Sequence, residues 1–453
     1  MNGPAESVPP TRSTTHEARS TTHGARSTKH EARSTIYSCS LRLGSIPILL
    51  PDPAAYLASY ARQLAVFERQ ASLTVNVIAE QSRDPDLLPQ ARQRSAEMIE
   101  AVNGQVADIR SIVGALLPAV TGPVSDRDVA SADTRWPLQH IHHLYRDWGW
   151  PSGPDDENAQ ALALVRDVVG DRPLGRVIVL GAGACRLAYD LHRSGAFDTT
   201  VVDLDPLLLA AAETVIRGGR VQLREANAEI DERARVSRMW TLQAPQGPLD
   251  DARFHFAIAD ALAPPFEPHA FDTVVTPWFV DVVPPDLRDF ISTIVGLLAP
   301  GGRWINMGPL RYPPERPVPL RFTREEVFEL AAMAGFRVDG WRSASVPYLV
   351  SKLASRGKVE WVLAFAATYT GEPESASGGL PPWLVFGHIP IPAAAPDAAA
   401  GEADPLRRAV LAALDGRRTL NDVTAAVAEG VSRRGVSRAD LRGAIRRFLA
   451  SRS

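Results

Sequence analysis

The stretch Ala270–Tyr312 reads AFDTVVTPWFVDVVPPDLRDFISTIVGLLAPGGRWINMGPLRY. Its apolar segment Thr273–Thr276 predicts a buried strand that ends in a loop, and the apolar positions over 285–298 recur at helical spacing. The turn Ala299–Gly302, with its Pro-Gly-Gly sequence, separates this helix from a second apolar strand over Arg303–Asn306. A strand, a helix and a strand in this order predict two parallel strands joined by a right-handed crossover.

A glycine-rich loop lies upstream, where Val177–Arg186 reads VIVLGAGACR. Gly181 and Gly183 would let the backbone approach a ligand closely at the start of a helix, where negative charge is favoured. The next predicted strand ends in Asp203, about twenty residues further on, where a carboxylate can accept hydrogen bonds from both hydroxyls of a ribose. Because Arg186 takes the place of the last glycine of G-x-G-x-x-G, a nicotinamide cofactor stays only an alternative, as does a tight turn without a ligand.

Strand and helix patterns alternate from Arg176 to Thr370, which predicts an α/β domain with a parallel sheet over residues 151–371. We expect its strands near 177–180, 199–203, 254–259, 273–276, 303–306, 337–345 and 360–368. We expect its helices near 185–193, 206–217, 285–298 and 323–334. The segment 220–250 is longer than a simple connection, and we expect it to be an irregular insertion.

The first 50 residues differ from the rest in pattern. Residues 13–33 hold three copies of a seven-residue unit, STTHEAR, STTHGAR and STKHEAR, which has no apolar seam for a coiled coil. We therefore expect residues 1–50 to be a disordered low-complexity tail. Loose metal binding by its evenly spaced histidines is a minor alternative, and a start codon placed too far upstream would also explain the segment.

A helical domain is predicted over residues 51–150. One face of its first helix carries apolar residues at helical spacing, namely Leu57, Tyr60, Ala61, Leu64 and Phe67. The domain ends in a dense aromatic and charged segment, WPLQHIHHLYRDWGWP, over Trp136–Pro151. Such a domain could serve as an interaction bundle, as a lid over an active site, or as both. His140, His142 and His143 lack a cysteine or carboxylate at matching spacing, so we predict no metal site here.

The C-terminal part divides into a flexible linker over 372–403, rich in Ala, Pro and Gly, and a small unit over 404–453. This unit holds 11 Arg against 5 acidic residues, a net charge of +6, in three helix-like stretches. Without interleaved aromatic residues, the charge alone makes nucleic-acid binding improbable.

Composition sets the broad class. The chain has 453 residues, 45% hydrophobic and 22% charged, with a net charge of −3, as expected for a globular protein of two or three domains. Its two cysteines, Cys39 and Cys185, make neither a disulfide framework nor a zinc site. Neither a transmembrane run nor a signal-peptide pattern is evident, so we expect a cytoplasmic protein without a membrane partner.

Several polar residues follow predicted strands at the edge where ligands bind in α/β sheets. Asp260, followed by Ala261, ends the third strand, although a carboxylate there could also cap a helix or loop. Thr276-Pro277-Trp278-Phe279 ends the fourth strand, where an aromatic face would favour a positively charged methyl group or amine. Trp278 could equally be a core aromatic residue.

Two further residues are candidates for holding the acceptor. Asp281 could accept a hydrogen bond from a substrate N–H and so orient another nitrogen for attack, or it could begin the helix that follows. Asn306 ends the next strand and could line the same pocket, or pair with the turn after it. We predict Asp281, Trp278 and Asn306 as the catalytic set.

The chain resembles the carnosine N-methyltransferase family from about Trp136 to Thr368. Four segments carry the resemblance, and the last two are specific: Tyr145–Trp148 (YRDW), Leu180–Ala188 (LGAGACRLA), Thr276–Asp281 (TPWFVD) and Trp304–Leu310 (WINMGPL). The resemblance implies a class I methyltransferase fold with a Rossmann-like sheet, S-adenosylmethionine as cofactor, and transfer of a methyl group to an imidazole nitrogen.

The resemblance also implies roles for single residues. Arg146 would reach the methionine carboxylate of the cofactor, with His143 one turn before it. Asp203 would bind the ribose and Asp260 the adenine amino group, and Asp281 would hold the imidazole. The full predicted cofactor set is His143, Arg146, Gly181, Gly183, Asp203, Asp260, Ala261 and Thr276.

Two departures from the family pattern fall on the acceptor side. Pro313 stands where the family has a histidine that contacts substrate, and Arg356–Glu360 lacks the family's tyrosines. We therefore expect an imidazole in a histidine-containing small molecule or peptide other than carnosine. Two alternatives stay open: another amine or oxygen acceptor of a natural product, and a non-catalytic binding protein, which Cys185 in the glycine loop makes conceivable.

The C-terminal unit resembles small winged-helix domains that accompany some methyltransferases and peptide-modifying enzymes. The short segment Leu414–Leu420, LDGRRTL, carries this likeness. It implies a basic surface on which a peptide substrate could dock, while a dimerisation or packing domain is an equally good interpretation. The sequence does not fix the oligomeric state.

Overall fold

The computed structural model describes residues 41–131, 138–151, 153, 156–227, 236–249, 252–282, 285–355, 357–431 and 438–452. The heptapeptide repeats and Cys39 lie outside these residues. The segment Thr35–Ser453 forms one compact unit.

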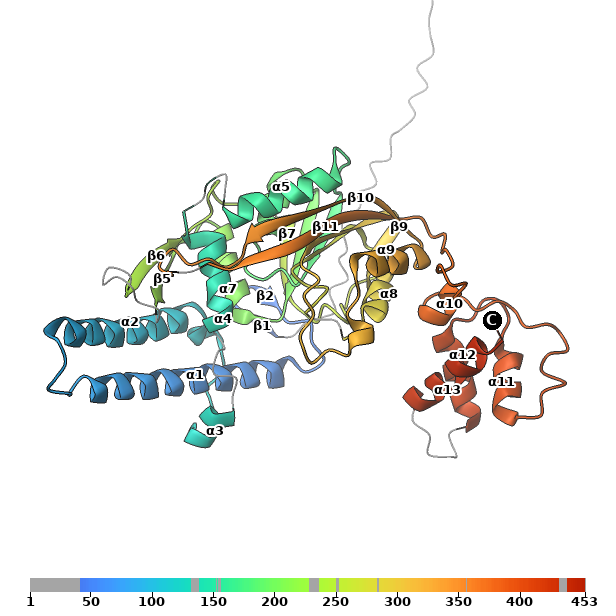
Figure 1. The fold of residues 1–453 in the computed structure, drawn as a ribbon, viewed down its shortest axis with the longest axis horizontal. Helices are drawn as coiled ribbons and strands as arrows, with labels where there is room; N and C mark the ends of the chain where they lie inside the picture. Colours follow the sequence, from blue (N-terminus) through green and yellow to red (C-terminus); the bar gives the residue numbers. More distant parts are fainter. Residues whose placement is uncertain are drawn as a thin grey trace, which may run out of the picture. The chain divides into compact units, whose positions relative to one another are not determined.

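A seven-stranded sheet forms the centre of this unit, with the strand order β10-β11-β9-β8-β3-β4-β7 (Figure 1). This is the strand order of a class I methyltransferase sheet. Its strands are β3 (Arg176–Leu180), β4 (Asp198–Asp203), β7 (Phe254–Ile258), β8 (Phe271–Pro277), β9 (Leu298–Gly308), β10 (Phe336–Pro347) and β11 (Val359–Tyr369). All seven coincide with predicted strands, with ends shifted by a few residues.

The expectation of a wholly parallel sheet is wrong at one edge. The strands β7, β4, β3, β8 and β9 are parallel, but β11 lies antiparallel to both β9 and β10. The connection from Pro347 to Val359 contains no helix among its described residues. A connection without a crossover helix favours antiparallel pairing of the two strands it joins.

Two hydrophobic cores cover the two faces of the sheet. Val177 and Val179 of β3 point into one core, whereas Ile178 and Leu180 point into the other, as the alternation along a strand requires. The first core includes residues of α5 (Glu157–Val169), α6 (Arg186–Arg193) and α7 (Pro206–Ile216); the second includes residues of α8 (Leu287–Leu297) and α9 (Arg324–Met333). A capping box of Thr323 and Glu326 starts α9.

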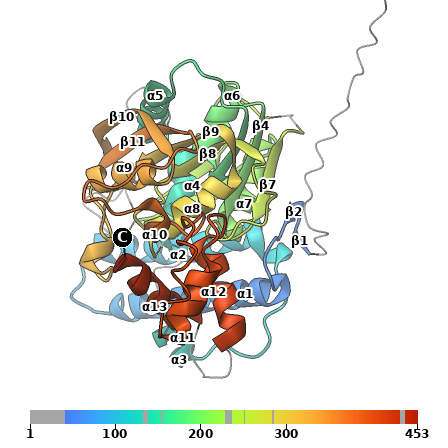
Figure 2. The same ribbon diagram turned by 90° about the vertical axis from the view of Figure 1, so that its right-hand side faces the viewer.

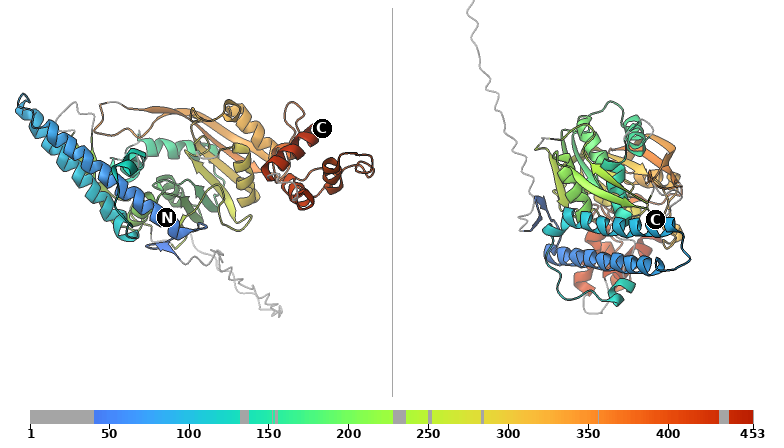
Figure 3. Two further views of the ribbon diagram at one scale, coloured as in Figure 1. Left: turned by 90° about the horizontal axis from the view of Figure 1, so that it is seen from below. Right: turned by 90° about the vertical axis from the view of Figure 1, so that its left-hand side faces the viewer.

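The N-terminal region consists of two long helices, α1 (Pro53–Gln81) and α2 (Pro89–Val113), which lie side by side (blue in Figure 3). The apolar face predicted for α1 is buried. Four shorter elements follow among the described residues: a 3₁₀-helix over Gly114–Leu116, α3 (Asp126–Ser131), α4 (Leu138–Leu144) and a π-helix over Tyr145–Gly149.

The boundary predicted for the N-terminal tail at residue 50 is wrong. The strands β1 (Arg42–Leu43) and β2 (Ile46–Pro47) form a small hairpin, and the backbone N–H of Leu49 donates to the carbonyl of Ile258 at 2.7 Å. Leu43, Ile46 and Ile48 are each only 1% exposed. Burial of these apolar side chains beside β7 accounts for the order of residues 41–50.

The segment 220–250, predicted to be irregular, contains a second hairpin. Its strands are β5 (Val221–Ala226) and β6 (Ser237–Leu242). Glu225 occupies an inward position and is 2% exposed, where its Oε2 accepts hydrogen bonds from Nε1 of Trp150 at 3.1 Å and of Trp240 at 2.6 Å. A buried carboxylate in a strand hides the alternation of apolar and polar residues that usually identifies one.

The C-terminal unit consists of the helices α11 (Pro405–Ala413), α12 (Leu420–Val431) and α13 (Arg438–Ala450) (Figure 2). Their apolar residues share a small core with Leu384 and Ile391. Three helices match the predicted pattern, but over 404–431 and 438–452 the structure describes no strand pair that would make a wing. The linker prediction is wrong for α10 (Pro382–Val385) and its flank, because Val385 and Phe386 are buried in the core beside α8 and α9.

Among the described residues, the structure shows no helix that combines the length and the apolar character needed to cross a membrane.

Candidate active site

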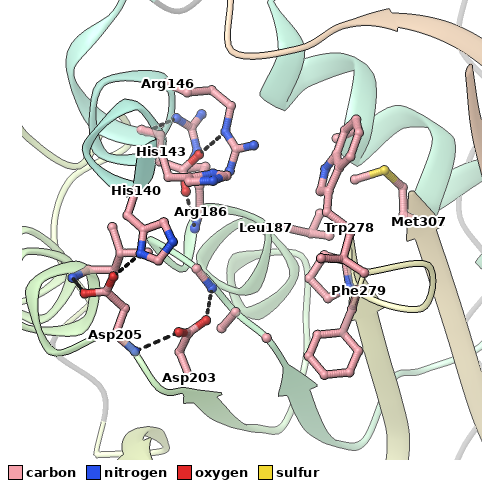
Figure 4. A pocket seen from close by; sticks show the side chains of 18 of the residues that line it. His140, His143, Arg146, Arg186, Leu187, Asp203, Asp205, Trp278, Phe279 and Met307 are labelled. Atoms are coloured by element: carbon pink, nitrogen blue, oxygen red, sulfur yellow. Dashed lines mark hydrogen bonds and ion pairs between the residues drawn. The ribbon is translucent and has the colours of Figure 1, made fainter. Parts of the chain in front are cut away.

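A cavity of about 340 Å³ lies at the carboxyl ends of β3, β4, β7 and β8 (Figure 4). The chain proceeds from β3 to β4 and β7 in one direction and to β8 and β9 in the other, so the cavity lies where the strand order reverses. Ligands of open α/β sheets bind at such a switch point. Eight predicted site residues line this cavity: His143, Arg146, Gly181, Gly183, Asp203, Asp260, Ala261 and Trp278.

The glycine loop forms the floor between β3 and α6. Gly181 has a φ of +69°, and a Cβ there would lie 2.2 Å from Cδ2 of Phe279. Gly183 has a φ of +56°, and a Cβ there would meet no atom within 4 Å. The first glycine is therefore required by packing against the β8 loop, whereas the second leaves backbone facing open space beside the cavity. Cys185 is fully buried at the start of α6 and does not line the cavity.

Asp203 ends β4 and its carboxylate is held by backbone donors. Oδ2 accepts from the N–H of Gly183 at 2.7 Å, and Oδ1 accepts from the N–H of Asp205 at 2.9 Å. Burial, followed by the charge of Asp205, raises the pKa of Asp203 to about 6. The carboxylate thus fixes the glycine loop and presents its negative charge to the cavity.

Asp205 joins the helical domain to this side of the site. Its Oδ1 accepts from the hydroxyl of Tyr60 on α1 at 2.9 Å, and its Oδ2 pairs with Nδ1 of His140 on α4. The same carboxylate caps α7. His140 is therefore engaged by a carboxylate at the cavity wall (Figure 4).

Arg146 and His143 form the wall contributed by α4 and the π-helix. Nε of Arg146 pairs with Asp147 at 2.6 Å, and one terminal nitrogen pairs with Glu157 at 3.0 Å. Burial lowers the pKa of Arg146, but these two carboxylates raise it by more, so the guanidinium stays charged. Nδ1 of His143 is buried without a hydrogen-bond partner among the described residues. Burial, and then the charge of Arg146, lowers the pKa of His143 well below its usual value, so its imidazole is neutral.

Asp260 and Ala261 lie just after β7. Oδ1 of Asp260 accepts from the backbone N–H of Leu262 at 2.8 Å, which fixes the loop. Ala261 is 7% exposed and lines the same cavity.

Trp278 closes the far end of the cavity in a strained backbone conformation. Its φ is +53°, unusual for a residue with a side chain, and its N–H donates to the carbonyl of Met307 at 2.7 Å. A Cβ on Gly308 would lie 2.9 Å from Cα of Trp278, so a glycine is required beside it. The ring packs on Tyr348 with centroids 4.5 Å apart.

Two predicted site residues lie in the sheet interior instead. Thr276 and Asn306 are paired across β8 and β9, and both are fully buried. The hydroxyl of Thr276 donates to Oδ1 of Asn306 at 3.0 Å and accepts from Nε1 of Trp304 at 2.9 Å. Neither residue lines the cavity. The two side chains hydrogen-bond to each other because they face the core beside α8 and α9, and not the edge of the sheet where ligands bind.

Asp281 is 1% exposed and does not itself line the cavity, although it lies in the loop between Phe279 and Val282, which do. Its Oδ2 accepts from the backbone N–H of Arg311 at 2.9 Å, whereas its Oδ1 is buried without a partner among the described residues. Burial raises the pKa of Asp281 to about 6. A buried carboxylate oxygen without a donor is costly, which makes Asp281 a candidate for binding a ligand.

Tyr348 and Glu157 are two of the cavity residues that were not predicted from the sequence. Tyr348 follows β10 and stacks on Trp278, which places a tyrosine at the acceptor end although Arg356–Glu360 has none. Glu157 pairs with Arg146 and accepts from the N–H of Leu349 at 2.7 Å. Tyr348 could have been noticed as an aromatic residue directly after the strand end Val346-Pro347. No feature of the sequence pointed to Glu157.

The cavity fits S-adenosylmethionine on features of this structure. A carboxylate at the end of β4, open backbone at Gly183, and a charged arginine beside an unpartnered histidine nitrogen line one continuous space. These groups suit a ribose, a close approach of the ligand, and an α-amino acid carboxylate, in that order.

Comparison with known proteins agrees with this arrangement. The profile of the carnosine N-methyltransferase family matches residues 126–358, slightly more than half of the chain. Carnosine N-methyltransferase unmet from Drosophila melanogaster is 29% identical over 146 residues, covering 30% of this chain and 32% of that protein. The chain therefore spans about a third of the length of this relative.

Solved structures of methyltransferases are also similar. Phosphoethanolamine N-methyltransferase 2 from Haemonchus contortus, in complex with S-adenosyl-L-methionine, is 19% identical with a TM-score of 0.34, covering 57% of this chain and 62% of that one. An S-adenosylmethionine-dependent methyltransferase from Mesorhizobium loti is 17% identical with a TM-score of 0.30, covering 47% of this chain and 97% of that one. The strand order supports the fold independently, and the family profile supports the relationship: the chain belongs to the carnosine N-methyltransferase family.

Proposed function

We propose that this chain is an S-adenosylmethionine-dependent N-methyltransferase whose acceptor is an imidazole nitrogen of a histidine-containing small molecule or peptide other than carnosine. Membership of the family supports the reaction class. The altered acceptor side, with Pro313 and without tyrosines over Arg356–Glu360, supports a different acceptor.

Cofactor binding falls to the half of the cavity formed by the glycine loop, β4, β7 and the π-helix. Asp203 would accept from the ribose hydroxyls, and Asp260 with Ala261 would contact the adenine. Arg146 would pair with the methionine carboxylate, to which neutral His143 can donate an N–H. When bound, the cofactor supplies an electrophilic methyl group on a sulfonium, which passes to the attacking nitrogen.

Acceptor binding falls to Asp281, Trp278 and Tyr348. Oδ1 of Asp281 would accept from one imidazole N–H, which directs the lone pair of the other nitrogen at the methyl group. The ring of Trp278, which packs against Tyr348, would exclude water and favour the positive charge that the imidazole gains. Alignment is the main contribution, because an imidazole nitrogen needs little chemical activation to attack a sulfonium.

The observation that carries this proposal is the unpartnered Oδ1 of Asp281, buried in the loop whose residues Phe279 and Val282 line the cavity. A carboxylate oxygen held there matches an N–H donor on the acceptor. It does not match an oxygen acceptor that lacks a donor.

Mass spectrometry of reactions with S-adenosylmethionine tests the proposal. The acceptor panel should contain free histidine, histidine dipeptides including carnosine, longer histidine peptides, simple amines and hydroxyl compounds. A gain of one methyl group on histidine compounds, with carnosine among the poorest of them, is the expected result. Methylation of amines or hydroxyls alone would replace the imidazole assignment with another acceptor class. Failure to bind S-adenosylmethionine would reject the enzyme itself.

A further inference from the structure

A second buried carboxylate, Asp205, lies two residues after Asp203 and has no part in the proposed function. Asp205 is 5% exposed, and its backbone N–H donates to Oδ1 of Asp203 at 2.9 Å. Burial, and then the charge of Asp205, raises the pKa of Asp203. Because two neighbouring buried carboxylates repel each other, a cation beside them would stabilise the ionised form of both.

His140 lies beside both carboxylates. Its Nδ1 pairs with Oδ2 of Asp205, and its charge lowers the pKa of Asp203 against the larger effect of burial. The side chain of His140 is 42% exposed, so it can hold a proton without the full cost of burial, unlike the neutral His143. His140 lines the cofactor cavity on the same wall as Asp203 and Asp205 (Figure 4).

A second cavity brings the helix α1 to the other side of this wall. It has a volume of about 250 Å³, and it shares with the cofactor cavity His140, Asp203, Leu204 and Asp205. Its other lining residues come from α1, among them Tyr60, whose hydroxyl donates to Oδ1 of Asp205 at 2.9 Å. Asp205 is therefore held from α1 on one oxygen and holds His140 with the other.

The wall of the cofactor cavity thus offers both a donor and an acceptor to a sugar. A ribose hydroxyl both donates and accepts hydrogen bonds, and a carboxylate such as Asp203 can only accept. A ligand that covers Asp203 also removes water from it, which makes its negative charge more costly. An imidazolium at His140 would supply the missing donor and offset this cost.

We propose that His140, oriented by Asp205 and Tyr60, is a further cofactor-binding residue, whose imidazolium donates to a ribose hydroxyl oxygen while Asp203 accepts from the ribose. Cofactor binding is then coupled to protonation of His140, and the helical domain contributes to the site through Tyr60. This inference concerns the cofactor alone. Methyl transfer to a compound other than an imidazole would reject the proposed acceptor and leave this inference intact.

The charged and titratable groups around His140 come from several elements: Asp203, Asp205, Tyr56 and Tyr60 line cavities with it, and His142, His143 and Arg146 lie on α4 and the π-helix. Burial, and then the charge of Asp205, raises the pKa of Tyr56 and of Tyr60, so both keep their protons up to pH 9. Arg146 stays charged and His143 stays neutral. A variant of His142 therefore serves as the control.

Calorimetric titration with S-adenosylhomocysteine from pH 7 to pH 9 tests the coupling. His140→Asn keeps an N–H for Asp205 but cannot carry a charge. At pH 7 it should bind about 10- to 30-fold more weakly than wild type, as expected for the loss of a charge-assisted hydrogen bond. The ratio of the two affinities should shrink towards one by pH 9, where wild-type His140 loses its proton. Because both proteins bind the same compound, titration of the ligand cancels in this ratio.

His142→Asn on the same helix should keep the wild-type affinity and its pH dependence. His142 does not line the cofactor cavity. A ratio between wild type and His140→Asn that stays constant from pH 7 to pH 9 would show that His140 only supports the wall, and would overturn the inference. Equal affinities at pH 7 would overturn it as well.

The 2′,3′-dideoxy analogue of S-adenosylhomocysteine tests contact with the ribose. Without the hydroxyls, wild type and His140→Asn should bind this analogue equally at pH 7. If His140→Asn loses as much affinity for the analogue as for S-adenosylhomocysteine, His140 does not act on the ribose and the inference fails.

Tyr60→Phe tests the link to the helical domain. It removes the hydroxyl that donates to Asp205 and should weaken binding of S-adenosylhomocysteine by about 3- to 5-fold at pH 7. In the His140→Asn background the same change should have no further effect, because Tyr60 acts through His140. An equal loss in both backgrounds would overturn the part that the inference gives to Tyr60.

Discussion

The carboxylates of the cofactor half and of the acceptor half of the cavity differ in how fully they are hydrogen-bonded. On the cofactor half, Asp203 accepts from two backbone N–H groups and Asp260 accepts from one. Each donor lies within two residues of its aspartate or in the adjacent glycine loop. On the acceptor half, Oδ1 of Asp281 and Nη1 of Arg316 are buried without a hydrogen-bond partner among the described residues. The cofactor half is thus fixed by local backbone geometry that any chain with this fold can form. The acceptor half consists of side chains on loops, where substitutions change the substrate without disturbing the fold.

The strongest test of this difference removes the carboxylate of the cofactor half. Asp203→Ala should weaken S-adenosylmethionine binding by about 100-fold or more, because it removes two ribose hydrogen bonds and the brace of the glycine loop. Isothermal titration calorimetry measures the affinity. The control is Asp198→Ala at the other end of β4, which should bind the cofactor normally. Equal affinities of Asp203→Ala and wild type would show that β4 does not carry the ribose site.

The corresponding change on the acceptor half should spare the cofactor. Asp281→Asn keeps an oxygen for the Arg311 N–H but lowers the charge that orients the acceptor, and kcat/KM should fall about 30- to 100-fold. Affinity for S-adenosylmethionine should change less than about twofold, and Asp289→Asn on the exposed side of α8 should leave both quantities unchanged. Loss of cofactor binding in Asp281→Asn would mean that the two halves are not separable.

Gly308→Ala tests the strained backbone between the halves. Its Cβ would lie 2.9 Å from Cα of Trp278, and overpacking of this kind costs about 1–3 kcal/mol. We expect a lower melting temperature and a larger loss of turnover than of cofactor affinity. Gly296→Ala in α8 has open space around its Cβ and should be neutral or slightly stabilising, by about 0.5–1 kcal/mol. Unchanged stability of Gly308→Ala would show that Trp278 relaxes easily.

The smallest expected effect concerns pH. The folded-state pKa of Asp281 is about 6, above its ordinary value of 3.8. Between these values the folded chain binds more protons than the unfolded chain, so this group lowers stability as the pH rises from about 4 to 6. Asp281→Asn removes the effect and should be about 1–2 kcal/mol more stable than wild type at pH 8, with the difference vanishing near pH 4. Melting curves at both pH values measure it, and a constant difference would contradict the shifted pKa.

The sequence predicted the main sheet well because its strands are apolar and end at clear turns. It missed the strands β5 and β6, since Glu225 occupies a buried strand position. It predicted the strand β11 but not its antiparallel direction, since pairing direction depends on the connection rather than on the strand. Thr276 and Asn306 were misplaced for a related reason: their polar side chains follow the strand pattern of ligand residues but face the core.

Asp281, Tyr312 and Arg316 show the same limit for the site. Asp281 stood out because it follows a strand end, but Tyr312 and Arg316 lie in a proline-rich loop with no periodic pattern. Their segment is held near Asp281 by two hydrogen bonds, from the N–H of Arg311 to Asp281 and from Arg316 to the carbonyl of Val282. Such contacts between distant segments require coordinates.

The close packing of Gly181 and Phe279 limits how these two positions can change during evolution. A side chain at position 181 would occupy the space of the Phe279 ring. The two positions belong to different halves of the cavity, yet neither can be altered freely while the other is kept. Because Gly181 also has a φ of +69°, which strains any side chain, relatives of this chain should keep a glycine at 181 even where the residue at 279 is smaller.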